Sequence, residues 1–146
     1  DAVMDISDAD IVIGCAAVAD YRPAKYQNKK IKKSDSENSS LALIKNRDII
    51  AAVSQRKERP FVVGFAAETE NMDEYAKGKM KSKKLDMVAA NCVGAGLVFG
   101  ADINALQVFW PEGNQTMTTA FKSHLARELM TLIIERYDAK NSTKDS

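Results

Sequence analysis

Four apolar segments are spaced along the chain, and each is predicted to form a strand. Residues 11–17 and 61–67 are continuous apolar runs, which are typical of strands buried on both faces of a sheet, and residues 86–91 are predicted to form a third short strand that ends on a polar residue. In residues 105–110, apolar side chains instead alternate with Gln107 and Phe109. The Pro-Glu-Gly-Asn turn that follows predicts that the next residues pair back as a hairpin.

Helices are predicted between and after these strands. Asn46 is expected to cap a helix that runs from residue 47 toward residue 57. A second helix is expected over residues 72–84, although it contains Gly78. The clearest helix is the last one, which extends to Tyr137 and carries these apolar residues on one face: Phe121, Leu125, Leu129, Leu132 and Ile133.

The order of strands and helices predicts an α/β fold. We expect a three-layer, Rossmann-like, mostly parallel sheet with helices on both faces and a C-terminal hairpin. Residues 24–40 are polar and rich in lysine and serine, which predicts a mobile flap or a hairpin before a short strand at residues 41–45. We expect one domain over residues 1–138 and a polar tail over residues 139–146. Ligands of such sheets bind beyond the carboxyl ends of the strands.

The composition is that of an ordinary soluble protein, with 45% hydrophobic and 28% charged residues. No apolar stretch approaches the roughly 20 residues that cross a bilayer, and no secretion leader is evident. Cys15 and Cys92 lie in apolar runs without a CxxC partner, so we expect buried, reduced thiols. These features predict a cytoplasmic protein that does not bind a membrane.

Basic residues are concentrated in two short runs. Residues 25–33 and 77–84 hold five lysines each and no acid, although the net charge of the chain is only +1. Such clusters indicate either a polyanionic ligand or a solvated face. Nucleic-acid binding is not expected, because the net charge is near zero and Tyr26 is the only aromatic residue in either run.

The residue inventory excludes several kinds of enzyme. His124 is the only histidine and is predicted to lie on a helix surface, so a Ser-His-Asp triad or a His-rich metal site is not expected. The sequence has neither a GxxxxGK[ST] loop nor a GxGxxG loop. The remaining lysines and strand-end acids suit phosphoryl or nucleotidyl transfer, which depends on positioning and charge neutralisation.

Three groups are candidates for binding the anion. Lys79 and Lys83 are four residues apart, so they share one face of the predicted helix. Lys30 comes from the flap and could close over the same anion. Asp20 could hold Mg²⁺, accept hydrogen bonds from a nucleotide, or simply cap a turn.

Several motifs in one order resemble those of bacterial phosphopantothenate–cysteine ligase, the synthetase half of the bifunctional coenzyme A biosynthesis protein. The principal motifs are GCAAVADYR at 14–22, KIKK at 30–33 and VGFAAET at 63–69. Residues 83–91 and 102–106 continue the resemblance, which covers nearly the whole chain. The resemblance implies that CTP activates the carboxylate of 4′-phosphopantothenate as an acyl-cytidylate, and that the amine of cysteine then displaces CMP.

The resemblance also implies a set of site residues. Lys30 would be the catalytic flap lysine, and Ala16 and Ala17 would contact the acyl substrate. The expected CTP-binding residues are Gly14, Cys15, Ala16, Asp20, Lys30, Arg47, Asp48, Ile49, Ile50, Phe65, Lys79 and Lys83. The family usually has proline where this chain has Arg47. Mg²⁺ is the expected cofactor, with Asp20 as a candidate ligand.

The chain departs from the family at its beginning. The family's synthetase domain starts with a Gly-rich strand–loop–helix segment that binds phosphopantothenate, and this chain starts after it. We therefore expect residues 1–138 to be a CTP-binding synthetase domain that lacks its N-terminal part. The expected partners are a second copy in a homodimer and a fused or associated decarboxylase half, which carries the FMN. A non-catalytic nucleotide-binding α/β module is the alternative.

Overall fold

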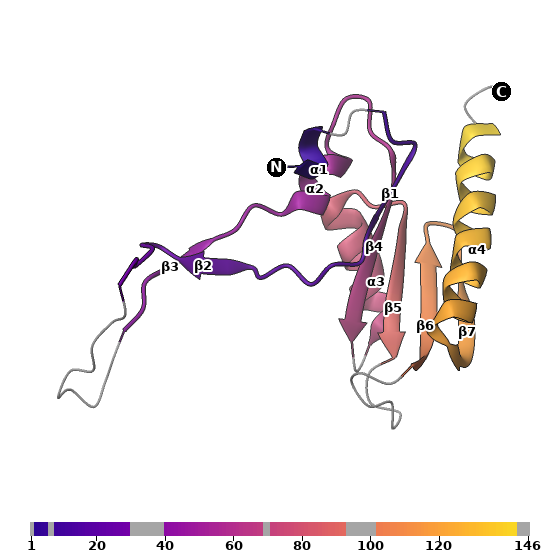
Figure 1. Cartoon of the computed structure of the whole chain (residues 1–146). Coiled ribbons are helices and arrows are strands. Elements are labelled where there is room, and N and C mark those ends of the chain that lie inside the picture. Colours follow the sequence, from indigo (N-terminus) through magenta and orange to yellow (C-terminus); the bar gives the residue numbers. More distant parts are fainter. Residues whose placement is uncertain (1, 6–7, 30–39, 69–70, 93–101, 143–146) are drawn as a thin grey trace. The chain divides into compact units, whose positions relative to one another are not determined.

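The computed structural model describes residues 2–5, 8–29, 40–68, 71–92 and 102–142 (Figure 1). The chain divides into two compact units. The larger unit consists of Asp1–Cys15 and Ile49–Ser146, and the smaller unit is Ala16–Asp48. Among the described helices, none has the length and apolar character needed to cross a membrane.

The larger unit is built on a five-stranded sheet with the strand order β1-β4-β5-β6-β7. Neighbouring strands are parallel from β1 to β5, and the last two pairings are antiparallel. Because β7 is antiparallel to β6, it runs in the same direction as β1, β4 and β5, so the predicted mostly parallel α/β sheet and its C-terminal hairpin are confirmed. The strands are β1 (Ile11–Gly14), β4 (Phe61–Glu68), β5 (Met87–Cys92), β6 (Ile103–Trp110) and β7 (Gly113–Phe121).

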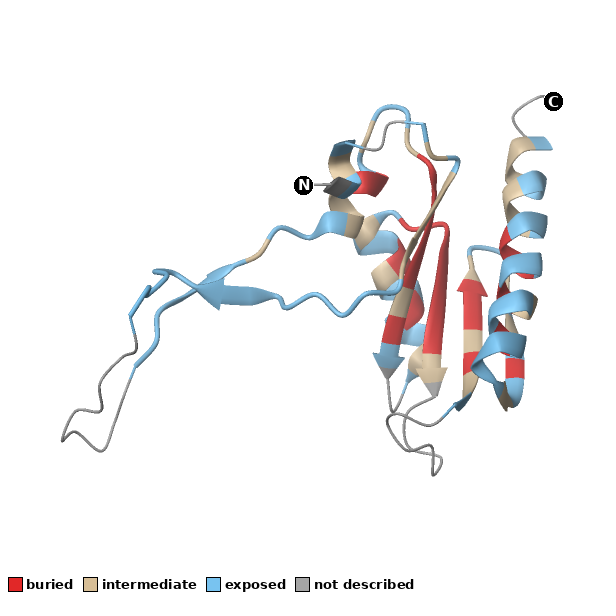
Figure 2. Ribbon diagram, in the orientation of Figure 1, coloured by how far each residue is buried: buried red, intermediate tan, exposed pale blue. Residues whose placement is uncertain are grey.

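Helices cover both faces of this sheet. One face packs against α4 (Lys122–Ser142), and the other packs against α2 (Ile49–Ser54) and α3 (Met72–Lys83). A short helix, α1 (Ala2–Asp5), contacts α2. Alternate residues of β4 enter the two cores, which explains why this strand is a continuous apolar run. The buried positions follow β4 and β5 in red in Figure 2.

The expected stripe of α4 is confirmed at four positions and wrong at one. Leu125, Leu129, Leu132 and Ile133 are buried against the sheet. Phe121 instead ends β7, where it pairs with Ile103, and 66% of its surface is exposed. His124 is exposed, as predicted.

The end of the last helix and the end of the first strand differ from the prediction. The final helix continues to Ser142, so residues 139–142 are helical rather than a tail. Its last turn is anchored by Lys140, whose ammonium lies 2.6 Å from the carboxylate of Asp86. The first strand ends at Gly14 rather than at residue 17, and Cys15 beyond it is exposed, so the predicted burial of that thiol is wrong. The side chain of Cys92 lies outside the described residues.

The smaller unit contains a two-stranded antiparallel ribbon. β2 (Tyr21–Pro23) pairs with β3 (Leu43–Lys45), and the main-chain N–H of Ala24 donates to the carbonyl of Ala42 at 2.8 Å. The ribbon agrees with the predicted hairpin, whose centre at residues 30–39 lies outside the described residues.

Candidate nucleotide-binding site

The backbone of Gly14, at the carboxyl end of β1, is in close contact with α2. A Cβ atom placed on Gly14 would lie 2.6 Å from Cγ1 of Ile50. Only glycine permits this approach without displacing the isoleucine. Gly14 also pairs with Gly64 of β4, so two glycines lie side by side at this level of the sheet. The structure thus brings Gly14 and Ile50, two of the predicted residues, together.

Lys79 holds a positive charge beside the carboxyl half of β4. Its ammonium donates a hydrogen bond of 3.1 Å to the carbonyl oxygen of Phe65. The ring of Phe65 packs with the core on the α4 side, whereas the buried residues Ala76 and Met80 place Lys79's helix on the other face. Lys79 therefore meets the main chain of Phe65, with the aromatic ring on the far side of the sheet.

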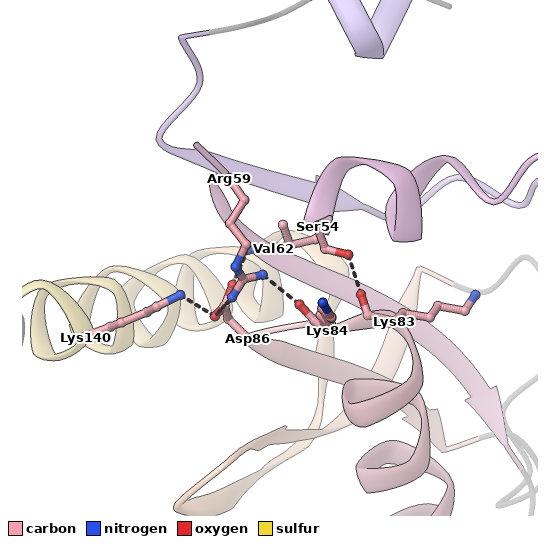
Figure 3. Close-up of polar contacts among 7 residues, drawn as sticks. All are labelled: Ser54, Arg59, Val62, Lys83, Lys84, Asp86 and Lys140. Carbon is pink, nitrogen blue, oxygen red and sulfur yellow. Dashed lines mark hydrogen bonds and ion pairs between the residues drawn. The ribbon is translucent and has the colours of Figure 1, made fainter. Parts of the chain in front are cut away.

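Lys83 lies one helical turn beyond Lys79, about 6 Å along the axis. The two lysines are therefore on one face of α3, as the spacing predicts. The carbonyl of Lys83 accepts a hydrogen bond from the buried hydroxyl of Ser54 (Figure 3). This bond ties the end of α3 to α2, so the two helices that carry the predicted contacts are linked directly.

In the smaller unit, Asp20 lies beside the segment that leads into residues 47–48. The main-chain N–H of Asn46 donates to the carbonyl of Asp20 at 2.7 Å. The side-chain amide of Asn46 donates to the carbonyl of Ala19 at 2.6 Å and accepts from Arg22 at 2.7 Å. Asn46 is thus used within this unit and does not cap the helix, which starts at residue 49 rather than 47.

The remaining predicted residues are only partly placed by the structure. Ala16 and Ala17 are exposed residues of the smaller unit, as are Arg47 and Asp48. Ile49 begins α2 in the larger unit. Lys30 lies outside the described residues.

A polar pair that the sequence analysis did not select lies at the same edge of the sheet. The side-chain amide of Asn104 donates to the side-chain oxygen of Asn91 at 2.9 Å. Asn91 lies near the carboxyl end of β5, opposite Ala67 of β4. Asn91 could have been selected from the sequence, because it is the polar end of the third predicted strand. Its partner Asn104 on β6 could not, because no spacing in the sequence indicates that the two residues meet.

No group of three His, Cys, Asp or Glu side chains gathers as a metal site within the described ranges. Mg²⁺ commonly uses one or two protein carboxylates and completes its shell with water and phosphate oxygens. The exposed carboxylate of Asp20 fits such a minimal contribution.

The fold and this edge define an open α/β domain, with a candidate ligand site where its parallel strands end. The chain belongs to the family described as the DNA/pantothenate metabolism flavoprotein C-terminal domain, which matches residues 1–137.

Curated relatives place the chain within larger proteins. It is 56% identical over 128 residues to the coenzyme A biosynthesis bifunctional protein CoaBC of Haemophilus influenzae, covering 87% of this chain and 32% of that protein. The Escherichia coli K12 protein of the same name is 44% identical over 140 residues, covering 93% of this chain and 34% of that protein. The chain therefore spans about a third of the length of these curated relatives.

A solved structure supports the same assignment. The crystal structure of the C-terminal domain of a CoaBC protein has a TM-score of 0.68 and 27% identity, covering 92% of this chain and 57% of that one. The Streptococcus pneumoniae DNA/pantothenate metabolism flavoprotein has a TM-score of 0.67 at 19% identity, covering 92% of this chain and 64% of that one, which shows the shared fold.

Proposed function

We propose that this chain carries the CTP-binding part of a phosphopantothenate–cysteine ligase, which acts in coenzyme A biosynthesis. Membership of the family and the 56% identity to a coenzyme A biosynthesis protein support the proposal. The structural observation that carries it is the position of Lys79, whose ammonium lies 3.1 Å from the carbonyl of Phe65 beside the carboxyl half of β4. A fixed cation near the strand ends suits a phosphate-bearing ligand.

The proposed reaction has two steps. A carboxylate oxygen of 4′-phosphopantothenate attacks the α-phosphorus of CTP, and the bond to pyrophosphate breaks. The amine of cysteine then attacks the acyl carbon, the bond to CMP breaks, and the amine loses a proton. Both steps depend on alignment of the reactants and on neutralising the charge of the departing phosphates.

The lysines are proposed to neutralise that charge. An ammonium group carries three N–H donors, and the carbonyl of Phe65 takes one from Lys79. Lys79 can thus contact phosphate oxygens while it remains oriented by the sheet. We propose that Lys83 contributes from the next turn of the helix, and that Lys30 is the catalytic lysine of the flap.

The remaining nucleotide contacts are proposed from the family resemblance. Gly14, Cys15 and Ala16 contribute backbone atoms, and Ala16 and Ala17 contact the acyl substrate. Asp20 accepts hydrogen bonds from the nucleotide or holds Mg²⁺, which would supply further charge neutralisation at the phosphates. The other proposed CTP contacts are Arg47, Asp48, Ile49, Ile50 and Phe65.

The proposed assembly is larger than this chain. We propose that the complete protein is a cytoplasmic homodimer in which this region follows a phosphopantothenate-binding segment and a decarboxylase half that binds FMN. The bifunctional names of the relatives and their length support the fused decarboxylase half.

Thermal unfolding with CTP, ATP, UTP and GTP tests the binding part of the proposal, with and without Mg²⁺. A ligand that binds only the native state at about 100 times its Kd stabilises it by about 2.7 kcal/mol, so CTP should raise the Tm by several degrees.

Lys79→Ala should weaken CTP binding about ten-fold, through loss of a charge-assisted hydrogen bond. Lys81→Ala, an exposed neighbour on the same helix, is the matched control. Equal CTP affinity in the two variants would remove the role given to Lys79.

Turnover is tested in the complete protein. Continued release of CMP and pyrophosphate over many turnovers should require both cysteine and 4′-phosphopantothenate, and Lys30→Ala should abolish it. Tight CTP binding without any turnover would instead support a non-catalytic nucleotide-binding module.

A further inference from the structure

A second polar site lies at the opposite, amino-terminal edge of the sheet. Asp86, which directly precedes β5, is only 8% exposed. One of its carboxylate oxygens accepts from Arg59 and from Lys140, each at 2.6 Å, and the other accepts from the main-chain N–H of Val62 at 2.8 Å (Figure 3). Two cations and a backbone donor therefore compensate this carboxylate fully.

A cavity of about 410 Å³ borders this network. Its apolar walls include the rings of Phe61 and Trp110, together with Pro111. Its charged walls include Asp86, Lys140, Arg136 and Glu112. The volume is within the range of cavities that hold small organic ligands, roughly 300–1,000 Å³.

Arg136 is the unusual member of this lining. Its guanidinium carbon lies 5.1 Å from the centroid of the Trp110 ring. Its Nε atom is buried, and no described residue accepts a hydrogen bond from it. Asp86 is already compensated by Arg59 and Lys140, and no ion pair joins Arg136 to an acid in the described part of the chain. The guanidinium of Arg136 therefore lines the cavity without an acidic partner among the described residues, and an anion bound there would neutralise its charge.

We propose that this cavity binds a small organic monoanion that carries an aromatic ring. The anionic group pairs with the guanidinium of Arg136, and the ring packs against Trp110 and Phe61. The charged residues of the lining favour a ligand with a single negative charge. The carboxylates of Asp86 and Glu112 would repel a polyanion such as a nucleotide triphosphate.

The cavity is separate from the proposed CTP site. Phe61 is the first residue of β4, whereas Lys79 contacts the fifth residue, Phe65. Four residues of strand span about 13 Å. A ligand here would therefore not occupy the nucleotide position, and the two sites can be tested independently.

Trp110 provides a direct reporter because it is the only tryptophan of the chain. Its indole N–H gives a single side-chain resonance in a proton–nitrogen NMR spectrum, which can be followed during titration. Three probes separate the two parts of the proposed ligand: 2-naphthoate has a ring and a charge, 2-naphthalenemethanol has the ring alone, and acetate has the charge alone. We expect a saturable shift of this resonance with 2-naphthoate and at least about ten-fold weaker binding of the other two.

Two variants test whether Arg136 is the residue that recognises the negative charge of the ligand. Arg136→Gln should weaken 2-naphthoate binding about ten-fold while leaving 2-naphthalenemethanol binding unchanged. Arg127→Gln, an exposed position of the same helix outside the lining, should change neither. A purely structural role of Arg136 would alter the binding of both naphthalene compounds alike, and that result would overturn the proposal. So would equal binding of the charged and uncharged probes by the unmodified protein, a comparison that does not depend on any variant folding.

Discussion

Replacing Asp86 with asparagine tests whether its ion-pair network stabilises the fold. Asp86→Asn keeps the shape of the side chain and removes its charge, so Arg59 and Lys140 lose their shared anionic partner. The side chain of Asp86 is 9% exposed, whereas those of Arg59 and Lys140 are 27% and 34% exposed. The charge removed is thus buried, and the cations left behind are partly hydrated.

The magnitude follows from these exposures. Removing one partner of a fully buried ion pair costs about 3–5 kcal/mol, and exposed pairs contribute about 0–1 kcal/mol. Because water reaches both cations and asparagine still offers an oxygen acceptor, we expect a loss of about 2–3 kcal/mol in the free energy of unfolding. Urea unfolding monitored by circular dichroism measures this value, and the slope with denaturant should not change.

Asp73→Asn is the matched control. Asp73 pairs with Lys77 at 2.7 Å one turn away on α3, but the two side chains are 56% and 65% exposed. Its loss should cost no more than about 0.5 kcal/mol and should vanish at high salt. If Asp86→Asn destabilised the protein no more than Asp73→Asn does, burial would not be what makes the Asp86 network stabilising.

Three further substitutions test the packing described above by thermal or urea unfolding. Gly78→Ala should stabilise the protein by about 0.5–1 kcal/mol, because Gly78 is an exposed helix residue with open space around a new Cβ; an unchanged Tm would contradict this. Gly14→Ala should cost about 1–3 kcal/mol by collision with Ile50, and the same substitution should cost less when it is made in an Ile50→Ala background, if the collision is its cause. Ser54→Ala should cost about 1 kcal/mol by removing the buried bond to the carbonyl of Lys83, and a neutral result would show that water replaces the hydroxyl.

The sheet could be predicted from sequence because its central strands are buried on both faces. Val62 and Val63 are adjacent in sequence, point to opposite faces, and are both fully buried. A continuous apolar run is the local signature of that environment. The four buried positions of α4 were predictable for a similar reason, because helical spacing alone places them on one face.

Boundaries could not be predicted where a distant residue decides them. The side chain of Asn46 bonds to Arg22 and Ala19, which are 24 and 27 positions away, so its suitability as a cap has no effect on where the helix begins. The last turn of α4 contains polar residues that look like a tail. It is nevertheless helical, and Lys140 within it bonds to Asp86, 54 positions away.

The candidate site was predictable in its residue types more than in its contacts. The spacing of Lys79 and Lys83 predicts a shared face, which the helix confirms. The bond from Lys79 to the carbonyl of Phe65 depends on how α3 packs on β4, and no local pattern encodes that packing. The pairing of Asn91 with Asn104 is hidden for the same reason, since the two residues meet only after β5 and β6 align.

Several polar contacts of the larger unit gather at the amino-terminal edge of its sheet, away from Lys79. Val62 and Asp86 exchange two hydrogen bonds there, through the main chain at 2.9 Å and through the carboxylate at 2.8 Å, which fixes the alignment of β4 with β5. Arg59 also donates to the carbonyl of Lys84 at 2.7 Å, which holds the end of α3 against the same edge. Because the alignment is set at that edge, the opposite edge does not need large interlocking side chains to stay in register. The close packing at Gly14 and the position of Lys79 are therefore compatible with an edge that remains open to a ligand.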